Sequence, residues 1–382
     1  MKRMGLMILA VGLFLFAQAA QADWTPAKRL TWTSSYSYAP AIVVDSSDFL
    51  HVIWYDFTPG NWEIYYKKST DGGASWAKSR RLTSNSGTSA VPDMAVDSSG
   101  NLHVVWVDLT PGNAEIYYKK STDGGASWTT SKRLTWTSGN SYAPAVAAGP
   151  SGNLHVVWYD ETPGNNEIFY KKSTDGGASW TTAKRLTWTA DTTAFPDVAV
   201  DPSGNPHVVW EDRTPGNAEL YYRKSADAGT NWATSQRLTW TSGWSQYPSI
   251  VLDPSGDPHV VWHDFTPGNA EIYYKKSTDG GDSWAKSQRL TWTADTSDVP
   301  VIAAGSSSHL HVVWYDQTPG NWELYYIRST DAGATWSTSQ RLTWSSGISE
   351  SPSLAVDSSG KPHVVWDDDT PGNAEIFYKR EN

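Results

Sequence analysis

The sequence contains no cysteine, and this absence removes several kinds of chemistry. Disulfide bonds, thiolate nucleophiles, cysteine-ligated zinc sites and iron–sulfur clusters all require that residue. A single closed domain of about 360 residues nevertheless buries enough apolar surface to be stable without cross-links. The chain must therefore take its stability from a packed core.

Positive charge is also scarce, with 30 Lys and Arg against 40 Asp and Glu and a formal net charge of −10. The acidic residues are spread evenly along the chain instead of forming a block. A net negative protein repels phosphate backbones and anionic lipid surfaces. We therefore expect neither nucleic acid nor a membrane surface as a partner.

Long apolar runs are missing except at the N-terminus, where Lys2 and Arg3 precede an apolar run over 4–17 and the small-residue sequence Ala-Gln-Ala at 20–22. This order is typical of a secretory signal peptide, and the run is too short to span a membrane. We expect residues 1–22 to be a signal peptide cleaved after Ala22. Loss of Lys2 and Arg3 would change the net charge from −10 to −12. The mature chain is expected to be secreted or periplasmic.

Repetition is what the sequence has in abundance. A tetrapeptide that begins with His-Val and ends with Trp starts at seven positions, each 52 residues after the last: His51, His103, His155, His207, His259, His311 and His363. The triplet Arg-Leu-Thr keeps the same period, starting at Arg29, Arg81, Arg133, Arg185, Arg237, Arg289 and Arg341. A repeat of this length indicates a solenoid or a propeller.

The second unit shows how one repeat predicts local structure. Segments rich in β-branched and aromatic residues predict strands over 91–96, 102–108, 115–120 and 132–135. Turn formers separate them, including Asp-Ser-Ser-Gly-Asn at 97–101 and Thr-Pro-Gly-Asn at 110–113. Four short antiparallel strands joined by tight turns make one propeller blade, and no stretch has helical periodicity.

The two ends of the chain predict a closed ring. The seventh unit stops before its fourth strand, and residues 24–32 match that missing piece, because Trp24 precedes Arg29 by the spacing that separates Trp76 from Arg81. When one blade is built from both ends of the chain, strand pairing between them closes the ring and leaves no exposed strand edge at the junction. We predict an all-β, seven-bladed propeller of four-stranded blades over 23–382, as a monomer. Its units begin near residues 33, 85, 137, 189, 241, 293 and 345, and residues 24–32 complete the last blade.

The turn before each fourth strand carries a recognisable motif. Ser-Thr-Asp-Gly-Gly-Ala-Ser-Trp at 69–76 resembles the Asp-box, or BNR repeat, of bacterial neuraminidases, and its Asp recurs at Asp71, Asp123, Asp175, Asp227, Asp279 and Asp331. The resemblance implies a propeller of the sialidase superfamily. Sialidases of that superfamily also carry an Arg-Ile-Pro motif, three arginines that bind the substrate carboxylate, a Tyr–Glu nucleophile pair and an acid Asp. This chain has no Arg-Ile-Pro, so no catalytic residue is carried over.

The residues of the box themselves suggest a structural role. An Asp side chain can bond back onto turn amides, a Gly permits positive φ, and the Trp can fill the interior of the blade. The second Gly is present in all six copies, whereas Ala228 and Ala332 replace the first.

Strand direction places the hairpins between second and third strands, with the blade-to-blade connections, on the face opposite the boxes. We call this the hairpin face. The copies diverge there, and the candidate ligand-binding residues are Tyr36, Tyr38, Tyr55, Trp62, Tyr142, Tyr159, Trp244, Tyr247, Tyr315 and Trp322. Aromatic rings beside small polar groups suit a sugar. Neutral drift in exposed loops and packing between blades are the alternatives.

The repeated ionisable residues can also be interpreted either as structural or as ligand-binding groups. Asp56 and Glu63 face each other across a hairpin, with Arg81 one strand further out, in nearly identical copies. We interpret them as a structural charge ladder, with a repeated cation or sugar site as the alternative. The His that opens each second strand predicts a core hydrogen bond rather than a metal site. His263 and His309 lie outside that register, and we expect them to be exposed. No cofactor or metal is expected.

Three functions remain open. The first is an exported, non-catalytic propeller that binds carbohydrate or another extracellular ligand through its hairpin face, weakly at each of several sites. The second is a sialidase-like glycoside hydrolase built from the residues that differ between copies: Glu211, Arg213, His263, Asp367 and Asp369. The third is a scaffold for protein partners at the cell surface. Fold alone does not choose among them.

Overall fold

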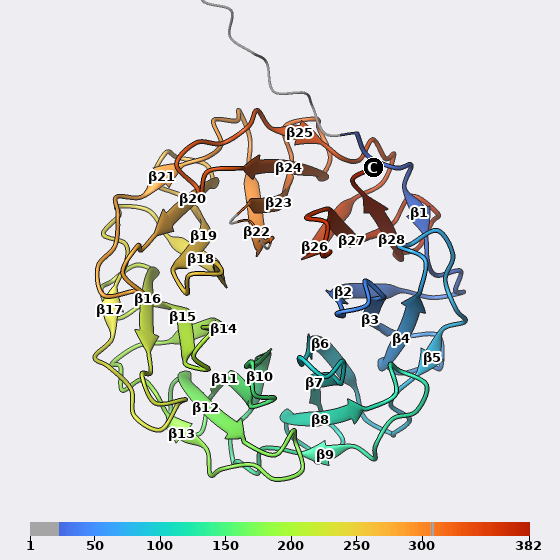
Figure 1. The fold of residues 1–382 in the computed structure, drawn as a ribbon, viewed down its shortest axis with the longest axis horizontal. Helices are drawn as coiled ribbons and strands as arrows, with labels where there is room; N and C mark the ends of the chain where they lie inside the picture. The colour runs from blue at the N-terminus through green and yellow to red at the C-terminus, as the bar shows by residue number, and fades with distance from the viewer. Residues whose placement is uncertain (1–22, 306, 308) are drawn as a thin grey trace, which may run out of the picture.

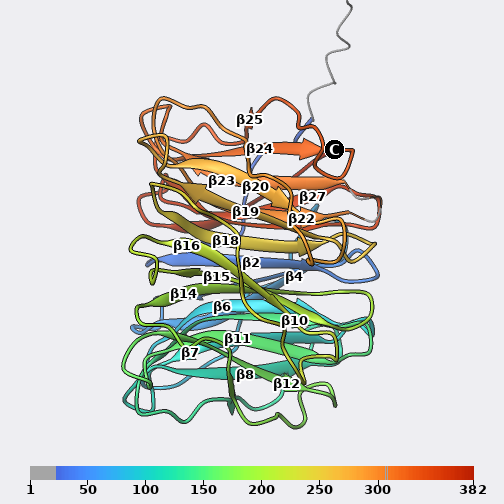
Figure 2. The ribbon, with the colours of Figure 1, turned by 90° about the vertical axis from the view of Figure 1, so that its left-hand side faces the viewer.

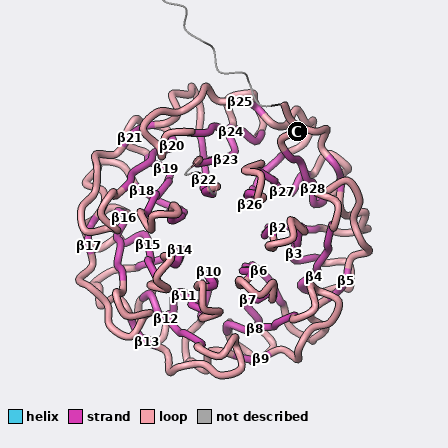
Figure 3. Tube along the Cα trace, in the orientation of Figure 1, coloured by secondary structure: helices cyan, strands magenta, loops and turns pink. Residues whose placement is uncertain are grey.

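A computed structural model describes residues 23–305, 307 and 309–382, which form seven four-stranded antiparallel sheets arranged as blades around one axis (Figure 1). The described residues contain no helix, and Figure 3 shows only strands joined by loops. The predicted seven-bladed propeller with a 52-residue repeat is confirmed. The predicted signal peptide, residues 1–22, lies outside the described residues.

The first two strands of each blade form the inner half of the ring (Figure 1). The first strands lie nearest the axis: β2 (Ser37–Val44), β6 (Ser89–Val96), β10 (Ser141–Ala148), β14 (Thr193–Val200), β18 (Ser245–Leu252), β22 (Ser297–Ala304) and β26 (Ser349–Val356). The second strands follow: β3 (Leu50–Asp56), β7 (Leu102–Asp108), β11 (Leu154–Asp160), β15 (Pro206–Asp212), β19 (Pro258–Asp264), β23 (Leu310–Asp316) and β27 (Pro362–Asp368). Both faces of the second strands are covered by neighbouring blades, so these strands are almost entirely buried.

The outer half of each blade consists of one long and one very short strand. The third strands are β4 (Glu63–Ser69), β8 (Glu115–Ser121), β12 (Glu167–Ser173), β16 (Glu219–Lys224), β20 (Glu271–Lys276), β24 (Glu323–Ser329) and β28 (Glu375–Arg380). The outermost strands are β1 (Lys28–Arg29), β5 (Arg80–Arg81), β9 (Lys132–Arg133), β13 (Lys184–Arg185), β17 (Gln236–Arg237), β21 (Gln288–Arg289) and β25 (Gln340–Arg341).

The outermost strand is shorter than the predicted 132–135, and a threonine explains the difference. The Leu134 amide still donates to the Ile116 carbonyl at 2.7 Å. The Ile116 amide donates to the Thr135 side-chain hydroxyl at 2.8 Å. In a regular antiparallel pair this amide would donate to a backbone carbonyl of the neighbouring strand. The pairing therefore continues through a side chain, and the regular ladder ends at Arg133.

The ring closes where the two ends of the described chain meet. Strand β1 pairs antiparallel with β28, with Lys28 opposite Tyr378 and Arg29 opposite Phe377, so the last sheet has the order β1-β28-β27-β26. In Figure 1 the C-terminus lies beside the segment that leads into β1. Trp24 packs edge-on against Tyr326 of the sixth blade with ring centroids 5.0 Å apart. The predicted completion of the last blade by the N-terminal segment is confirmed.

The Asp-box turns are held by the bonds expected of them. Asp71 Oδ1 accepts the Ser75 amide and the Ser69 hydroxyl, each at 2.8 Å. The Ser75 hydroxyl also donates to this carboxylate, and these hydrogen bonds lower the pKa of Asp71 to about 2. The box tryptophan differs from expectation: Trp128 packs edge-on against Tyr66 of the preceding blade, with centroids 5.2 Å apart. It therefore seals the boundary between blades instead of filling its own blade.

Candidate functional site

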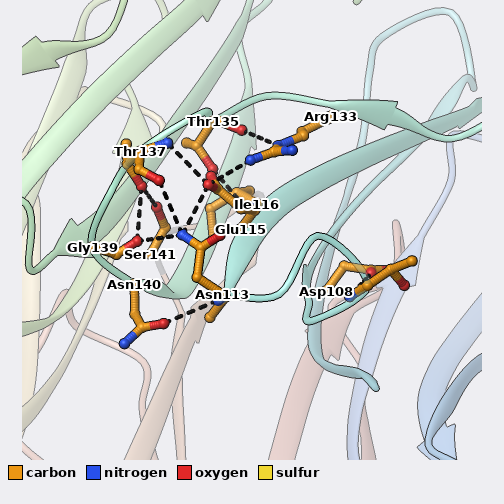
Figure 4. A network of polar contacts seen from close by, with 12 residues as sticks. Asp108, Asn113, Glu115, Ile116, Arg133, Thr135, Thr137, Gly139, Asn140 and Ser141 are labelled. Carbon is orange, nitrogen blue, oxygen red and sulfur yellow. Dashed lines mark hydrogen bonds and ion pairs between the residues drawn. The ribbon is translucent and has the colours of Figure 1, made fainter. Parts of the chain in front are cut away.

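Figure 2 shows the ring edge-on, with strands running across its thickness and loops gathered at its two faces. On the hairpin face an asparagine joins each hairpin to the following blade-to-blade connection, as Figure 4 shows for the second blade. Asn113 Nδ2 donates to the carbonyl oxygens of Thr137 at 3.1 Å and Gly139 at 2.6 Å. The hairpin and the connection are thus one fixed surface on which variable side chains are displayed.

A buried carboxylate lies beneath that surface in every blade. Glu115 is fully buried and accepts Arg133 Nη2 at 2.7 Å, the Thr137 amide at 2.9 Å and Asn113 Nδ2 at 3.1 Å (Figure 4). The same Arg–Glu ion pair spans 2.6–3.0 Å in all seven blades. In the described part of the chain no group of three or more His, Asp or Glu residues is placed to hold a metal ion. These contacts favour the structural interpretation of the ladder.

The histidine that opens each second strand is a core residue, as predicted. His103 is fully buried; its Nδ1 lies 2.8 Å from the Tyr118 hydroxyl and its Nε2 lies 3.1 Å from Asp97 Oδ2. The His–Tyr bond recurs in all seven blades at 2.6–2.8 Å. Burial lowers the pKa of His103, so the ring is neutral at pH 7.

The expectation that His263 is exposed is wrong. Only 2% of this residue is accessible to solvent, and its Nδ1 lies against the carboxylate of Asp298 from the next blade. The neighbouring blade therefore covers a position that looks terminal when one repeat is considered alone. His309 is partly buried.

A strained bulge recurs on all seven first strands near the hairpin face. The pairing register shifts between the second and fifth residue of each of these strands. Inside the bulge a non-glycine residue has φ between 40° and 52°: Ala39, Val91, Ala143, Phe195, Tyr247, Val299 and Ser351. Left-handed backbone costs roughly 1–2 kcal/mol for such residues, and strain of this kind gathers at functional sites. A proline follows each one, and that repeated X-Pro pair is the sequence signal for the bulge.

The structure brings four of the ten candidate aromatic residues together on the first blade. Tyr36 stacks on Tyr38 with centroids 5.9 Å apart, and Trp62 lies 5.8 Å from Tyr38 and 4.9 Å from Tyr55. Tyr36 is 47% exposed, whereas the other three are half-buried. This group is therefore an aromatic platform with one open ring at its edge.

The other six candidates are dispersed. Tyr142 and Tyr159 are adjacent, Tyr247 joins them through Phe195, and Tyr315 packs edge-on against Trp322 with centroids 4.9 Å apart. Trp244 has no ring contact with the other candidates; it packs against the Arg213 guanidinium and is 50% exposed. All of these except Trp244 are half-buried, so packing between blades accounts for much of this set.

Carboxyl groups of the seventh blade border the aromatic platform. Asp367 is 2% exposed and accepts the Ala39 amide at 3.0 Å, and burial raises its pKa well above the ordinary value. Burial and the nearby Asp369 raise the pKa of Glu350. The pKa of Tyr38 is raised by burial and then by Asp367, which places the platform and the acids in one electrostatic environment. We call Tyr36, Tyr38, Tyr55, Trp62, Glu350 and Asp367 the seam site.

The residues of the hydrolase hypothesis fall into two groups. Glu211 is fully buried and pairs with Arg213 at 3.3 Å; burial raises the pKa of Glu211, while Arg213 and then His263 oppose that rise. Asp369 on the seventh blade accepts the Ile348 amide at 2.6 Å, near Asp367. The first group lies on blades four and five and the second on blade seven.

The aromatic residues most exposed to solvent were not among the predicted site residues. Six tryptophans on the outer circumference are 68–71% exposed: Trp32, Trp136, Trp188, Trp240, Trp292 and Trp344. Each follows the Arg-Leu-Thr triplet, which is a signal present in the sequence. The period alone does not reveal that this position faces solvent.

These features define a seven-bladed propeller with repeated Asp-box turns and a variable hairpin face. Residues 11–260 match the family model described as the BNR repeat-like domain, and the chain belongs to that family. The resemblance to sialidase-like BNR propellers is thereby confirmed. No curated protein matches the chain.

Solved structures with similar folds come from several proteins. A protein of unknown function from Dyadobacter fermentans is 12% identical, with a TM-score of 0.59, and the match covers 93% of this chain and 98% of that one. The intramolecular trans-sialidase from Ruminococcus gnavus is 14% identical, with a TM-score of 0.51 and coverage of 92% and 95%. The α-L-arabinanase of Penicillium chrysogenum is 16% identical, with a TM-score of 0.54 and coverage of 77% and 93%. At these identities the likeness shows the fold.

Proposed function

We propose that this protein is an exported, non-catalytic propeller that binds carbohydrate through its hairpin face, at the seam site. The observation that carries the proposal is the aromatic platform of Tyr36, Tyr38 and Trp62 beside the carboxyls of Glu350 and Asp367. Aromatic faces cover the C–H surface of a sugar ring, and carboxyl groups form hydrogen bonds with its hydroxyls in either protonation state. Among the described residues no helix is long and apolar enough to cross a membrane.

The electrostatics of the seam site favour a neutral sugar over a sialic acid. The arginines of the Arg-Leu-Thr triplets all pair with buried glutamates, so they are not free to bind a substrate carboxylate. Acidic side chains surround Tyr38, namely Asp367, Glu350 and Asp369. Burial already disfavours negative charge on Asp367 and Glu350, so an anionic ligand would add a charge that this environment does not stabilise.

The test is a glycan array with residues 23–382, run with and without calcium, together with a fluorogenic sialoside assay on the same sample. We expect saturable binding without turnover and without dependence on calcium. Trp62→Ala should weaken binding because it removes the seam site, and it should fold, because Ala114 already occupies the equivalent position of the second blade. Trp322→Ala is the matched control for a hairpin tryptophan outside the seam site. An array with no binding, or binding that Trp62→Ala leaves unchanged, would contradict the proposal.

A sialidase-like hydrolase is the second candidate, and the buried acids Glu211 and Asp367 favour it. Burial raises the pKa of both, as a general acid requires. This candidate predicts sialoside turnover that Glu211→Gln or Asp367→Asn abolishes while the fold is retained. If the protein neither binds glycans nor turns over sialosides, the proposal becomes a scaffold for an extracellular protein partner.

A further inference from the structure

Grooves recur on the outer circumference at the boundaries between blades. Three of them form cavities of about 370, 400 and 650 Å³, sizes within the range of small-ligand sites. Each is walled by one exposed tryptophan of the preceding blade, Trp32, Trp292 or Trp188. These grooves share no lining residue with the seam site.

The wall opposite the tryptophan comes from the next blade and offers polar groups. In the first groove it includes Tyr65, Thr58 and Ser79. The Tyr65 ring is fixed by stacking on the buried Trp54 with centroids 5.9 Å apart. Within the described structure the Tyr65 hydroxyl has no hydrogen-bond partner, so it is free to bond a ligand. Tyr221 and Tyr325 occupy the same place in the other two cavities.

The exposed tryptophan is not needed to build the blade, because one copy does without it. The first blade has Ser84 at this position. In that copy Arg81 still pairs with Glu63 at 2.6 Å and the Leu82 amide still donates to the Ile64 carbonyl at 2.7 Å. Exposing so much apolar surface in six other copies therefore has no structural explanation.

The cations near the tryptophan are already engaged. The Arg29 guanidinium lies 5.8 Å from the Trp32 ring centre and pairs with Glu375, while Lys67 lies 5.6 Å from that ring and donates to the Leu30 carbonyl. They hold the indole in place, and the indole remains 69% exposed. Because neither cation is free and the protein is acidic overall, the groove favours an uncharged ligand.

We infer that the tryptophan-walled grooves are a second set of binding sites, each for one neutral pyranose ring. The apolar face of the sugar lies on the exposed indole, and its hydroxyls bond the tyrosine and threonine hydroxyls of the next blade. Six copies, at six of the seven blade boundaries, bind a polymeric or densely displayed neutral glycan with avidity that no single site supplies. The inference is independent of the seam site, since the residues are different.

The experiment is a titration of ¹⁵N-tryptophan-labelled protein, residues 23–382, followed through the indole N–H signals. The probes are methyl glycosides of mannose, galactose, glucose, N-acetylglucosamine and fucose, and each signal is assigned by a single Trp→Ser variant. We call the six exposed tryptophans on the outer circumference the rim tryptophans. We expect one or more probes, at millimolar concentration, to shift the indole N–H signals of the rim tryptophans. The Trp62 indole reports the seam site in the same spectra, so failure of one site is distinguished from failure of the other.

Two variants test how many of these grooves bind sugar and how much they strengthen binding to a glycan surface together. Replacing all six rim tryptophans by serine, the residue found at position 84, should reduce binding to a surface of the responsive glycan by about 10²- to 10⁴-fold. Ser84→Trp should add a seventh site, seen as one more bound sugar per chain. Unmoved rim indoles with every probe would overturn the inference. It would also be overturned if, in a Trp62→Ala background that removes the seam site, the six-fold serine variant bound the glycan surface as strongly as its parent.

Discussion

The hydroxyl of Tyr66 occupies the space that a Cβ atom on Gly125 of the next blade would need. Gly125 also has φ of 88°, so two separate requirements select glycine there. At its neighbour Gly124 a Cβ would approach only the mobile end of Lys68. This difference explains why all six boxes keep the second glycine whereas alanine replaces the first in two of them.

The first prediction follows from that contrast. Gly125→Ala should lower the free energy of unfolding by about 3 kcal/mol, because it adds backbone strain to overpacking against Tyr66. Gly124→Ala is the matched control and should cost about 1 kcal/mol, since Ala228 and Ala332 adopt φ of 52° at the equivalent positions. Denaturant titration of both variants measures the difference. Equal losses would show that close approach between blades is not what selects the second glycine.

The second prediction concerns the seam of the ring. Trp24 packs against Tyr326, whereas Trp32 on the same segment is 69% exposed. Trp24→Ala should cost about 3 kcal/mol as a partly buried aromatic is lost, and Trp32→Ala should cost less than about 1 kcal/mol. Calorimetry should therefore show a clearly lower melting temperature for the first variant alone. A similar shift for Trp32→Ala would indicate that the rim tryptophans are structural.

The architecture was predictable because every repeat imposes the same local choices on the chain. The period, the turn residues and the spacing from Trp24 to Arg29 together predicted seven blades and a closed ring. The length of the outermost strand was not predictable in this way. The Thr135 hydroxyl takes the place of a backbone carbonyl as the acceptor for the Ile116 amide. Strand propensity does not predict a hydrogen bond of this kind.

The candidate site was predictable only in part. Divergence among the copies pointed to the hairpin face, and the cluster of Tyr36, Tyr38 and Trp62 lies there. The burial of His263 was missed because Asp298 reaches it from another blade, across a boundary that a single repeat does not contain. The exposure of Trp32 was missed for the same reason, since solvent access at a blade edge depends on the neighbouring blade.

The third prediction tests the buried charge ladder. Arg133→Ala leaves the fully buried Glu115 without its cation and should cost about 3 kcal/mol. Glu115→Gln should cost less, because the cation left behind is 24% exposed and keeps contact with water. If these carboxylates were instead calcium ligands, added calcium would raise the melting temperature of the wild-type protein. We expect calcium to leave it unchanged.

The fourth prediction concerns acid stability and rests on two histidines that lack a carboxylate. In most blades an Asp precedes the second strand and faces the histidine, but Gly149 and Gly305 stand there in the third and sixth blades. His155 Nε2 and His311 Nε2 are accordingly buried without a partner in the described structure. Burial lowers the pKa of each of these residues to about 4.

A histidine whose pKa falls from 6.5 to about 4 on folding binds a proton more readily in the unfolded chain. The stability that depends on neutral His155 is therefore complete above pH 6.5 and is lost as the pH falls from 6.5 to about 4, by roughly 3 kcal/mol at most. Gly149→Asp should supply the missing partner, raise the pKa of His155 and flatten this loss, as measured by NMR titration and by melting temperature against pH. Gly149→Asn offers a neutral acceptor and should raise the pKa less. If Gly149→Asp left both curves unchanged, burial of His155 could not be the source of the acid sensitivity.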